Sequence, residues 1–417
     1  MSRTKIRKPN SVVYCAVFIL FYPLLKVFFR LEVDRGDYRP PKGPFIVVSN
    51  HQSFMDFLLT MLSLYPRRLN AVAARKFFFY RPLHKLLPFM GCIPKNLFDP
   101  DIASIRGIMA VINRGGRILL FPEGRCSVDG TYMGMHKATG KLIKKVGVPV
   151  ISCYIEGSYN CMPLWRKGFR PGRGRVTLAN LFSAEDTRRL SVDEINSRID
   201  ARLSGVDTRA PKKPFRVFPT RSLAKGLQNI LYYCPNCKRE FTLETRGNII
   251  RCANCGNAAA LDRSAKLHPT PGSVAPETVH KWYREQARHE MQSLHDDMEP
   301  IRLRVTVRMP AAPGRGLKYC GRGTLSLHPG GWHYTGELRG ESVRLFFPIE
   351  SVPAIPIDPN DNFQIYANGN FYVFRPESNP RACIKYATVG ECAYQRFSAS
   401  RQMTEGYDGG CFTGNPY

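Results

Sequence analysis

Acidic residues are scarce in this chain of 417 residues, where 33 aspartates and glutamates stand against 61 lysines and arginines. The imbalance lies in residues 1–230, which hold 39 basic and 15 acidic side chains, whereas residues 231–417 hold 22 and 18. A basic surface there favours an anionic membrane surface or a phosphorylated substrate. The chain also lacks an Arg/Gly tract and a helix-turn-helix pattern, so nucleic acid ranks below these partners.

The 13 cysteines lack the spacing of a disulfide framework, which indicates a reducing compartment. Four of them instead form two Cys-x-x-Cys pairs separated by fourteen residues: Cys234, Cys237, Cys252 and Cys255. Each such pair presents two thiolates in the same direction, so two pairs complete the tetrahedron of a zinc ribbon. Because all four ligands would be protein thiolates, we expect a structural Zn²⁺ with no open catalytic position.

An apolar run long enough for a clean membrane span is missing as well. The run from Val12 to Leu25 is broken by Pro23 and followed by Lys26, and it is shorter than the roughly 20 residues of a spanning helix. No small-residue cleavage site follows it, which argues against a signal peptide. We therefore expect a shallow or half-inserted anchor, with a buried core helix as the alternative.

Polar clusters follow two strand-like runs at the points where buried strands would end. His51 and Asp56 come after the run Phe45–Val48, and Glu123-Gly124-Arg125 comes after Ile118–Phe121. In an open α/β sheet, functional sites form at the carboxyl ends of the strands. These runs, together with Val150–Ile155, predict an α/β domain whose site lies at one sheet edge.

The spacing of His51 and Asp56 predicts a base and its orienting partner. Histidine is suited to removing a proton near neutral pH, and an aspartate across the turn into a helix can bond the second imidazole nitrogen. A substrate hydroxyl can then be the nucleophile. The alternative is a histidine that caps a helix and a solvated aspartate.

The sequence resembles the glycerolphosphate and lysophosphatidic acid (1-acylglycerol 3-phosphate) acyltransferase family. The His-x4-Asp motif and Phe-Pro-Glu-Gly-Arg are joined by Gly91-Cys-Ile-Pro-Lys95-Asn96 and by Val148-Pro-Val-Ile151, in the family's order. The resemblance implies His51 as general base and Asp56 as its partner. It also implies that Glu123, Gly124 and Arg125 shape the acceptor site and that Lys95 faces the acceptor phosphate.

The same resemblance implies the co-substrates and the location. An acyl group would pass from acyl-CoA or acyl carrier protein directly to a membrane lipid acceptor, without a catalytic metal or an acyl-enzyme. The simplest acceptor is 1-acylglycerol 3-phosphate; glycerol 3-phosphate, another lysophospholipid, a glycolipid or a lipoamino acid are alternatives. The basic residues before the apolar run place the catalytic domain on the cytoplasmic face of the membrane.

Two departures from the family pattern fall on the acceptor site. The commonest form of the third motif reads Phe-Pro-Glu-Gly-Thr-Arg-Ser, whereas here Arg125 comes one position earlier and Cys126 follows it. Lys95 stands where arginine is commoner, and an ammonium is not equivalent to a forked guanidinium. Acyl transfer is therefore better supported than the acceptor headgroup. We interpret Cys126 as a packing residue, since the family uses a hydroxyl substrate as nucleophile.

The chain divides into segments of different composition. In order they are a basic segment and anchor (1–34), the acyltransferase domain (35–205), a basic Pro-rich linker (206–229), the zinc ribbon (230–262), a linker helix (275–298), a β-rich module (300–400) and a tail (401–417). Alternation of Ile301, Leu303, Val305 and Val307 with polar residues begins the β-rich module. Six or seven antiparallel strands and a helix at Val389–Phe397 resemble a PH- or GRAM-like fold in topology.

Two other classes of function stay open. The acyltransferase domain could be a non-catalytic lipid-binding platform whose ribbon and β-rich module recruit a protein partner that the sequence does not identify. The zinc ribbon could instead belong to a nucleic-acid-binding protein with an apolar anchor. Binding that depends on salt, without acyl transfer, would support the second class.

Overall fold

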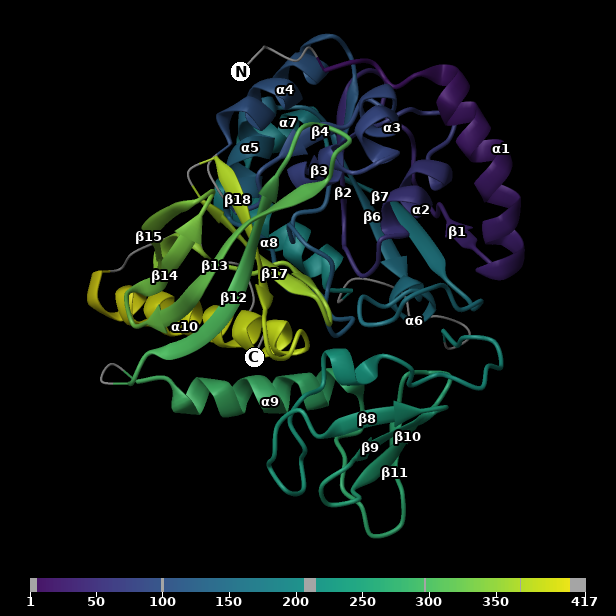
Figure 1. Ribbon diagram of the computed structural model, residues 1–417. Helices are drawn as coiled ribbons and strands as arrows, with labels where there is room; N and C mark the ends of the chain where they lie inside the picture. The colour runs from purple at the N-terminus through teal and green to yellow at the C-terminus, as the bar shows by residue number, and fades with distance from the viewer. Residues whose placement is uncertain (1–5, 99–100, 206–214, 296–297, 368, 406–417) are drawn as a thin grey trace.

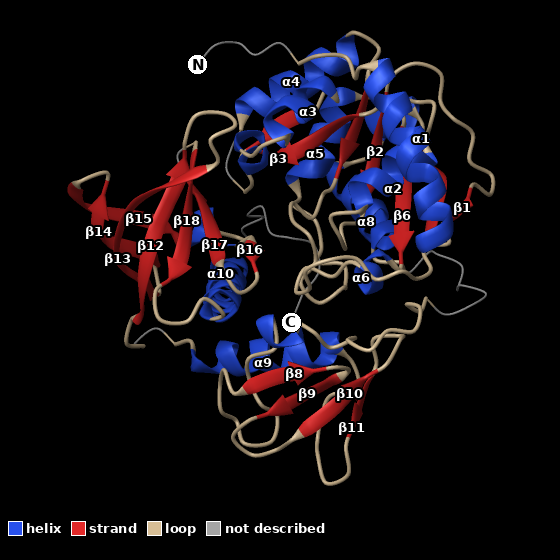
Figure 2. Cartoon of the chain, turned by 45° about the vertical axis from the view of Figure 1, so that its right-hand side comes forward, coloured by secondary structure: helices blue, strands red, loops and turns tan. Residues whose placement is uncertain are grey.

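The computed structural model describes residues 6–98, 101–205, 215–295, 298–367 and 369–405. Three sheets organise these residues: a mixed seven-stranded sheet, a four-stranded sheet and an antiparallel seven-stranded sheet. Figure 1 and Figure 2 show them as three lobes, with the four-stranded sheet below the other two. We call the parts built on these sheets the α/β domain, the cysteine-rich segment and the C-terminal module.

The α/β domain is built on a sheet of strand order β1-β7-β6-β2-β5-β3-β4. Its strands are β1 (Glu32–Asp34), β2 (Phe45–Ser49), β3 (Asn70–Ala74), β4 (Ile93–Lys95), β5 (Arg117–Leu120), β6 (Val150–Glu156) and β7 (Arg175–Phe182). The three predicted strands are confirmed to within a residue or two. β2 is buried along its length and pairs in parallel with β5 and β6. The ends of β2 and β5 therefore open at one sheet edge, whereas β6 and β7 are antiparallel.

Helices cover both faces of this sheet (Figure 2). They are α2 (Asp56–Ser63), α3 (Leu83–Phe89), α4 (Ile102–Asn113), α5 (Ala138–Val146), α6 (Ser158–Cys161), α7 (Ala184–Arg189) and α8 (Val192–Leu203). A capping box opens α8: the Ser191 hydroxyl accepts from the Glu194 backbone N–H, and the Glu194 carboxylate accepts from the Ser191 N–H. This reciprocal cap explains why α8 begins at Val192.

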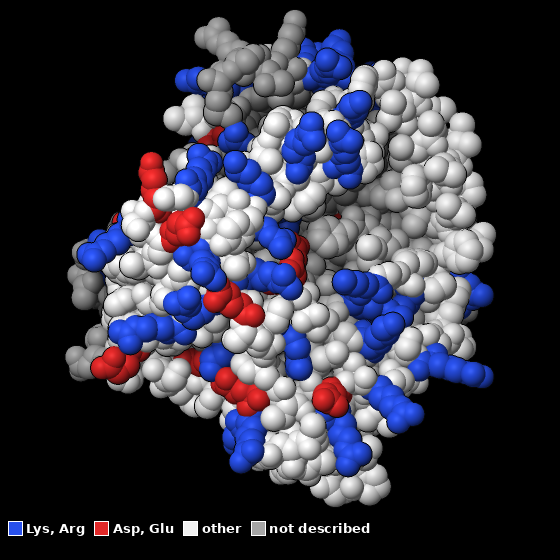
Figure 3. All heavy atoms as spheres, viewed as in Figure 1, with Lys and Arg blue, Asp and Glu red and all other residues white. Residues whose placement is uncertain are grey.

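The N-terminal helix α1 (Ser11–Phe28) lies along the outside of the α/β domain (Figure 1). Tyr14 and Leu25 pack inward, but Ile19 and Leu20 are 67% and 60% exposed, and only 11% of the helix is buried. The alternative of a buried core helix is therefore wrong. Figure 3 shows that the surface over α1 is almost free of charged side chains, whereas lysines and arginines are spread over the rest of this face.

The cysteine-rich segment forms a sheet of order β11-β10-β9-β8. Its strands are β8 (Leu243–Arg246), β9 (Ile249–Cys252), β10 (Ala258–Leu261) and β11 (Leu267–Pro269), followed by helix α9 (Val279–Ser293). β8 and β9 form a hairpin with its turn at Gly247-Asn248, where Gly247 adopts the left-handed conformation that such a turn requires. The sheet also extends beyond residue 262 to β11.

The C-terminal module is a sheet of order β15-β14-β13-β12-β18-β17-β16 in which every pairing is antiparallel. Its elements are β12 (Ile301–Pro310), β13 (Leu317–His328), β14 (Gly331–Leu338), β15 (Glu341–Pro348), β16 (Ile357–Asp358), β17 (Asn362–Ala367), β18 (Asn370–Pro376) and helix α10 (Ala382–Glu405). The short β16 was not predicted, and α10 is longer at both ends than the predicted helix. Residue 368, between β17 and β18, lies outside the described residues.

Helix α9 joins the cysteine-rich segment to the rest of the molecule. The Trp282 indole N–H donates to the Tyr233 carbonyl, and the Gln286 amide donates to the Ile230 carbonyl while its oxygen accepts from the Tyr232 N–H. On its other side α9 packs against α10. His280 on α9 also reaches the α/β domain, because its Nδ1 lies 2.7 Å from an Asp129 carboxylate oxygen.

Candidate active site

His51 lies just past the end of β2, and its ring is held by Asp56. The distance from His51 Nδ1 to Asp56 Oδ2 is 3.1 Å, and the same carboxylate oxygen accepts the Ser53 backbone N–H at 2.7 Å. Asp56 is fully buried at the start of α2. The turn between strand and helix thus carries both groups, and it leaves His51 Nε2 directed away from Asp56 for chemistry.

Glu123, from the turn after β5, holds the backbone of the His51 loop. One of its carboxylate oxygens accepts the His51 N–H at 2.6 Å, and the other accepts the Met133 N–H at 3.0 Å. The side chain is 1% exposed, and this burial raises its pKa to about 8 although both N–H donors oppose the shift. This geometry supports a positioning role for Glu123; the prediction that it shapes the acceptor site itself stays a prediction.

Cys126 contacts the catalytic candidate directly. Its Sγ lies 3.2 Å from His51 Nε2, and the adjacent Ser127 N–H donates to the His51 carbonyl at 2.8 Å. The His51 ring also stacks on Phe121, with 4.2 Å between ring centroids. Burial alone would lower the pKa of His51, but Cys126 and Asp56 together raise this pKa well above its ordinary value. The sequence-based interpretation of Cys126 as only a packing residue therefore missed this contact.

His51 and Cys126 open onto a cavity of about 960 Å³. Most of the lining is apolar, with Phe54, Phe77, Leu87 and Leu97 from the α/β domain among it. The C-terminal module supplies another part of the wall, from the stretch 350–357 and from one face of α10. The volume lies at the upper end of the range for small-molecule sites, which is roughly 300–1,000 Å³. The sequence had not indicated that the module would border the site.

The cavity also contains a basic corner. Lys95 and His136 both line it, and burial followed by the charges of Lys95 and Lys141 lowers the pKa of His136. Gly124 lies at the cavity edge with φ of +74°, and a Cβ built on it would come within 2.8 Å of the Phe98 ring. A side chain at position 124 would therefore displace the wall.

Arg125 turns towards the C-terminal module. Its guanidinium lies 2.7 Å from a Glu391 carboxylate oxygen on α10 and donates to the Ile355 carbonyl at 3.1 Å. The other Glu391 oxygen accepts the Ile355 N–H at 2.8 Å. Both charged side chains are buried. Arg125 also borders the cavity, and its role towards the acceptor stays a prediction. Its ion pair with Glu391 joins the Phe-Pro-Glu-Gly-Arg motif to the C-terminal module.

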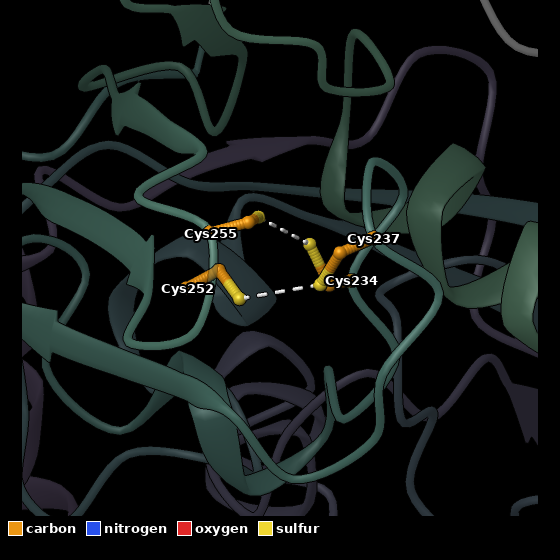
Figure 4. Close-up of side chains that lie close together, drawn as sticks. All are labelled: Cys234, Cys237, Cys252 and Cys255. Carbon is orange, nitrogen blue, oxygen red and sulfur yellow. Dashed lines mark hydrogen bonds between the residues drawn. The ribbon is translucent and has the colours of Figure 1, made fainter.

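The four cysteines of the two pairs come together as the spacing predicts. Their sulfur atoms all lie within 4.8 Å of one another (Figure 4). The two loops have matching hydrogen bonds: Lys238 N–H donates to Cys234 C=O and Gly256 N–H to Cys252 C=O, both at 3.0 Å. Residues Lys238 and Gly256 both have positive φ. This repeated loop geometry and four convergent thiols fit a tetrahedral metal ion.

Comparison with known proteins agrees with the motifs. Residues 30–156 match the family model described as Acyltransferase. A chloroplastic 1-acyl-sn-glycerol-3-phosphate acyltransferase of Brassica napus is 28% identical over 153 residues, which cover 36% of this chain and 43% of that enzyme. The alpha form of the mouse enzyme is 26% identical, over 41% of this chain and 60% of that enzyme. The chain thus spans less than two thirds of the length of either relative.

Solved structures were compared as well. The 1-acyl-sn-glycerophosphate acyltransferase PlsC of Thermotoga maritima is similar over 48% of this chain and 81% of that chain, with 20% identity and a TM-score of 0.42. A Ran Binding Domain of Nup2 from Ashbya gossypii is similar over 23% of this chain and 95% of that one, with 18% identity and a TM-score of 0.19. Both scores are low.

The buried ion pair between the motif and the module gives a prediction about stability. We expect Glu391→Ala to lower the free energy of unfolding by about 3–5 kcal/mol, because it leaves the Arg125 charge buried without this partner. Glu377→Ala, which removes an exposed pair with Arg304 at 3.7 Å, is the control and should cost at most about 1 kcal/mol. Denaturant unfolding measures both, and equal effects would contradict the assignment.

Proposed function

Because residues 30–156 match the family model described as Acyltransferase, we propose that this protein is a membrane-associated O-acyltransferase. It would move an acyl group from acyl-CoA or acyl carrier protein to the hydroxyl of a lysophospholipid, with 1-acylglycerol 3-phosphate as the first candidate and phosphatidic acid as the product. The observation that carries this proposal is the His51–Asp56 pair, with His51 lining a large, mainly apolar cavity.

In the proposed reaction, His51 Nε2 takes the proton of the attacking hydroxyl as the ester bond forms. Asp56 keeps the ring oriented through Nδ1 and stabilises the positive charge that develops on it. The buried Glu123 keeps the loop in place through the His51 N–H. No metal is required for this step, because the thioester already provides a good leaving group.

The headgroup assignment is supported by the basic corner of the cavity. Lys95, with the His136 side chain near it, would face a phosphate, and the apolar walls would hold acyl chains. The names of the relatives specify 1-acyl-sn-glycerol-3-phosphate as their acceptor. Glycerol 3-phosphate, another lysophospholipid or a glycolipid are the alternatives, since the shifted Arg125 is bound to Glu391 instead of being held ready for a headgroup.

Membrane association is supported by α1. Apolar side chains are exposed along the helix, and the residues before it are basic, which favours a helix lying in or partly inserted into the cytoplasmic leaflet. We propose that the catalytic domain lies on the cytoplasmic side. Delivery of a lipid acceptor from the same leaflet would then require no transfer through water.

The remaining two parts would serve as structural and docking units. We assign a structural Zn²⁺ to the four cysteines, whose thiolates would hold the two loops together. A PH- or GRAM-like fold for the C-terminal module is supported by its antiparallel sheet and by the helix α10 that follows the last strand. A non-catalytic scaffold is the alternative function, and it would not require the contact between His51 and Asp56.

Acyl transfer is tested with a panel of lysolipids and glycerol 3-phosphate, each with a long-chain acyl-CoA and with acyl carrier protein as donors. We expect the membrane-reconstituted protein to acylate 1-acylglycerol 3-phosphate. His51→Ala should lower kcat by about 10²–10⁴ because the general base is lost. His295→Ala, which changes an exposed histidine, is the control. Full activity of His51→Ala would exclude the assigned base, and no acylation with either donor would exclude the proposed function.

Metal binding is tested by elemental analysis of the purified protein. We expect about one zinc per chain, because four thiolates complete its coordination. Cys234→Ser should lose the metal and expose the segment around β8 and β9 to proteolysis. The matched control, Cys15→Ser, changes a thiol on α1 and should keep the metal. A metal-free protein with all thiols reduced would rule out the assigned site.

The role of α1 is tested with a double substitution, Ile19→Asp with Leu20→Asp. Both side chains are exposed, so we expect the melting temperature to stay near that of the unchanged protein while binding to anionic vesicles is strongly reduced. Val274→Asp is the control, because Val274 is a half-exposed apolar residue of the cysteine-rich segment. Vesicle co-sedimentation measures the effect, and unchanged binding of the double variant would count against α1 as the anchor.

A further inference from the structure

Helix α10 presents one face to the cavity that His51 borders. The residues of α10 that line the cavity near its C-terminal end are Tyr394, Phe397, Ser398 and Arg401. They follow one another at the spacing of a single helical face, whereas Arg396, Ala399 and Ser400 between them are exposed. We call these four lining residues the inner face of α10.

The near end of the inner face lies close to the base. Glu391, about one helical turn before Tyr394, forms the buried ion pair with Arg125. The residue after Arg125 is Cys126, whose sulfur contacts the His51 ring. Tyr394 is itself buried, at 8% exposure. The C-terminal module therefore borders the cavity beside the site of chemistry.

The far end of the inner face reaches solvent. The Arg401 guanidinium lies 5.2 Å from the centroid of the Phe397 ring, and it pairs with the Glu350 carboxylate at 3.6 Å. The side chains of Arg401 and Glu350 are 36% and 57% exposed. At 1.5 Å per residue, α10 advances by about 15 Å between Glu391 and Arg401. The inner face thus extends from the vicinity of the base to the surface of the molecule.

The walls around the inner face are mainly apolar. The loop before β17 adds Pro353, Pro356 and Ile357 to the lining, and the α/β domain adds Ile105 of α4 and Leu142 of α5. The basic corner at Lys95 and His136 belongs wholly to the α/β domain. A phosphate would therefore bind away from the module's apolar wall, and a long hydrocarbon is the part of a lipid substrate that suits this wall.

Several contacts hold the C-terminal module against the α/β domain. The Lys76 ammonium lies 3.1 Å from an Asp358 carboxylate oxygen, and the Asn96 amide donates to the Gly369 carbonyl at 3.2 Å. The Gly316 N–H donates to the Phe79 carbonyl at 2.8 Å. Together with the ion pair between Arg125 and Glu391, these contacts fix the position of the wall relative to the base.

We propose that the inner face of α10 binds a fatty acyl group and limits the length of acyl group that the protein uses. This inference rests on the proposed acyl transfer. It assigns the selection of the acyl group to residues outside 30–156, the region that matches the family model. The acyl group has two sources, the donor thioester and the lysolipid acceptor, because both carry the same hydrocarbon.

The wall is tested with Ser398→Trp, which adds a large side chain to a small residue of the inner face. The full-length protein is reconstituted in vesicles, and kcat/KM is measured for octanoyl-CoA and palmitoyl-CoA with one acceptor. Lysolipids with short and long acyl groups are then compared with one donor. We expect the long-to-short ratio to fall by at least about tenfold in one series, because one methylene group in an apolar pocket is worth that much. The series that changes identifies the source.

Two further variants separate this effect from a general disturbance of α10. Ala399→Trp adds the same side chain to the next residue, which is exposed, and it should leave both ratios unchanged. Ser398→Leu adds less volume and should give a smaller shift in the same direction, so that the proposal stays testable if Ser398→Trp does not fold. The melting temperature of each variant shows whether it is folded.

Two results would overturn the proposal while leaving acyl transfer intact. One is an equal loss of activity with short and long acyl groups in the folded Ser398 variants, and the other is the same shift in Ala399→Trp. If no lipid is acylated, the proposed function fails, and the wall is judged by binding alone. The ratio of Kd values of octanoyl-CoA and palmitoyl-CoA, measured by calorimetry below micelle formation, should then differ between Ser398→Trp and the unchanged protein. An unchanged ratio would reject the wall as well.

Discussion

The buried carboxylate of Glu123 is the contact on which the geometry of this site depends. It accepts backbone N–H groups from His51 and from Met133, and so joins the loop after β2 to the segment that follows the β5 turn. A buried carboxylate is costly unless hydrogen-bond donors satisfy it, and these two N–H groups do so here. His51 is therefore held through its own backbone, while Asp56 orients its imidazole ring.

The turn from residue 121 to residue 127 organises the site in two directions. Arg125 points to α10 and forms a buried ion pair with Glu391, whereas the next residue, Cys126, points to the His51 ring. The order Arg-Cys in this motif thus links the C-terminal module and the base through adjacent side chains. The module consequently forms part of the cavity wall.

Local patterns predicted much of this structure, and contacts distant in sequence account for the rest. The strands at β2, β5 and β6, the capped helix α8 and the cysteine cluster follow from periodicity, cap residues and ligand spacing. The pairing of Arg125 with Glu391 and of Asp129 with His280 could not be predicted, because residues 266 and 151 positions apart carry no common local signal. The contact of Cys126 with His51 was missed for a different reason: the family analogy assigned the nucleophile to the substrate.

The buried Arg125–Glu391 pair couples the packing of the C-terminal module to the conformation of the turn from residue 121 to residue 127. Burying two charges is favourable only when the geometry is good and further hydrogen bonds are made. Here the Ile355 C=O accepts from Arg125, and the Ile355 N–H donates to Glu391. A shift of the turn that carries Glu123 and Cys126 would move Arg125 as well and leave Glu391 buried without it. The docked module therefore favours the same turn conformation that places the thiol and the buried carboxylate against His51.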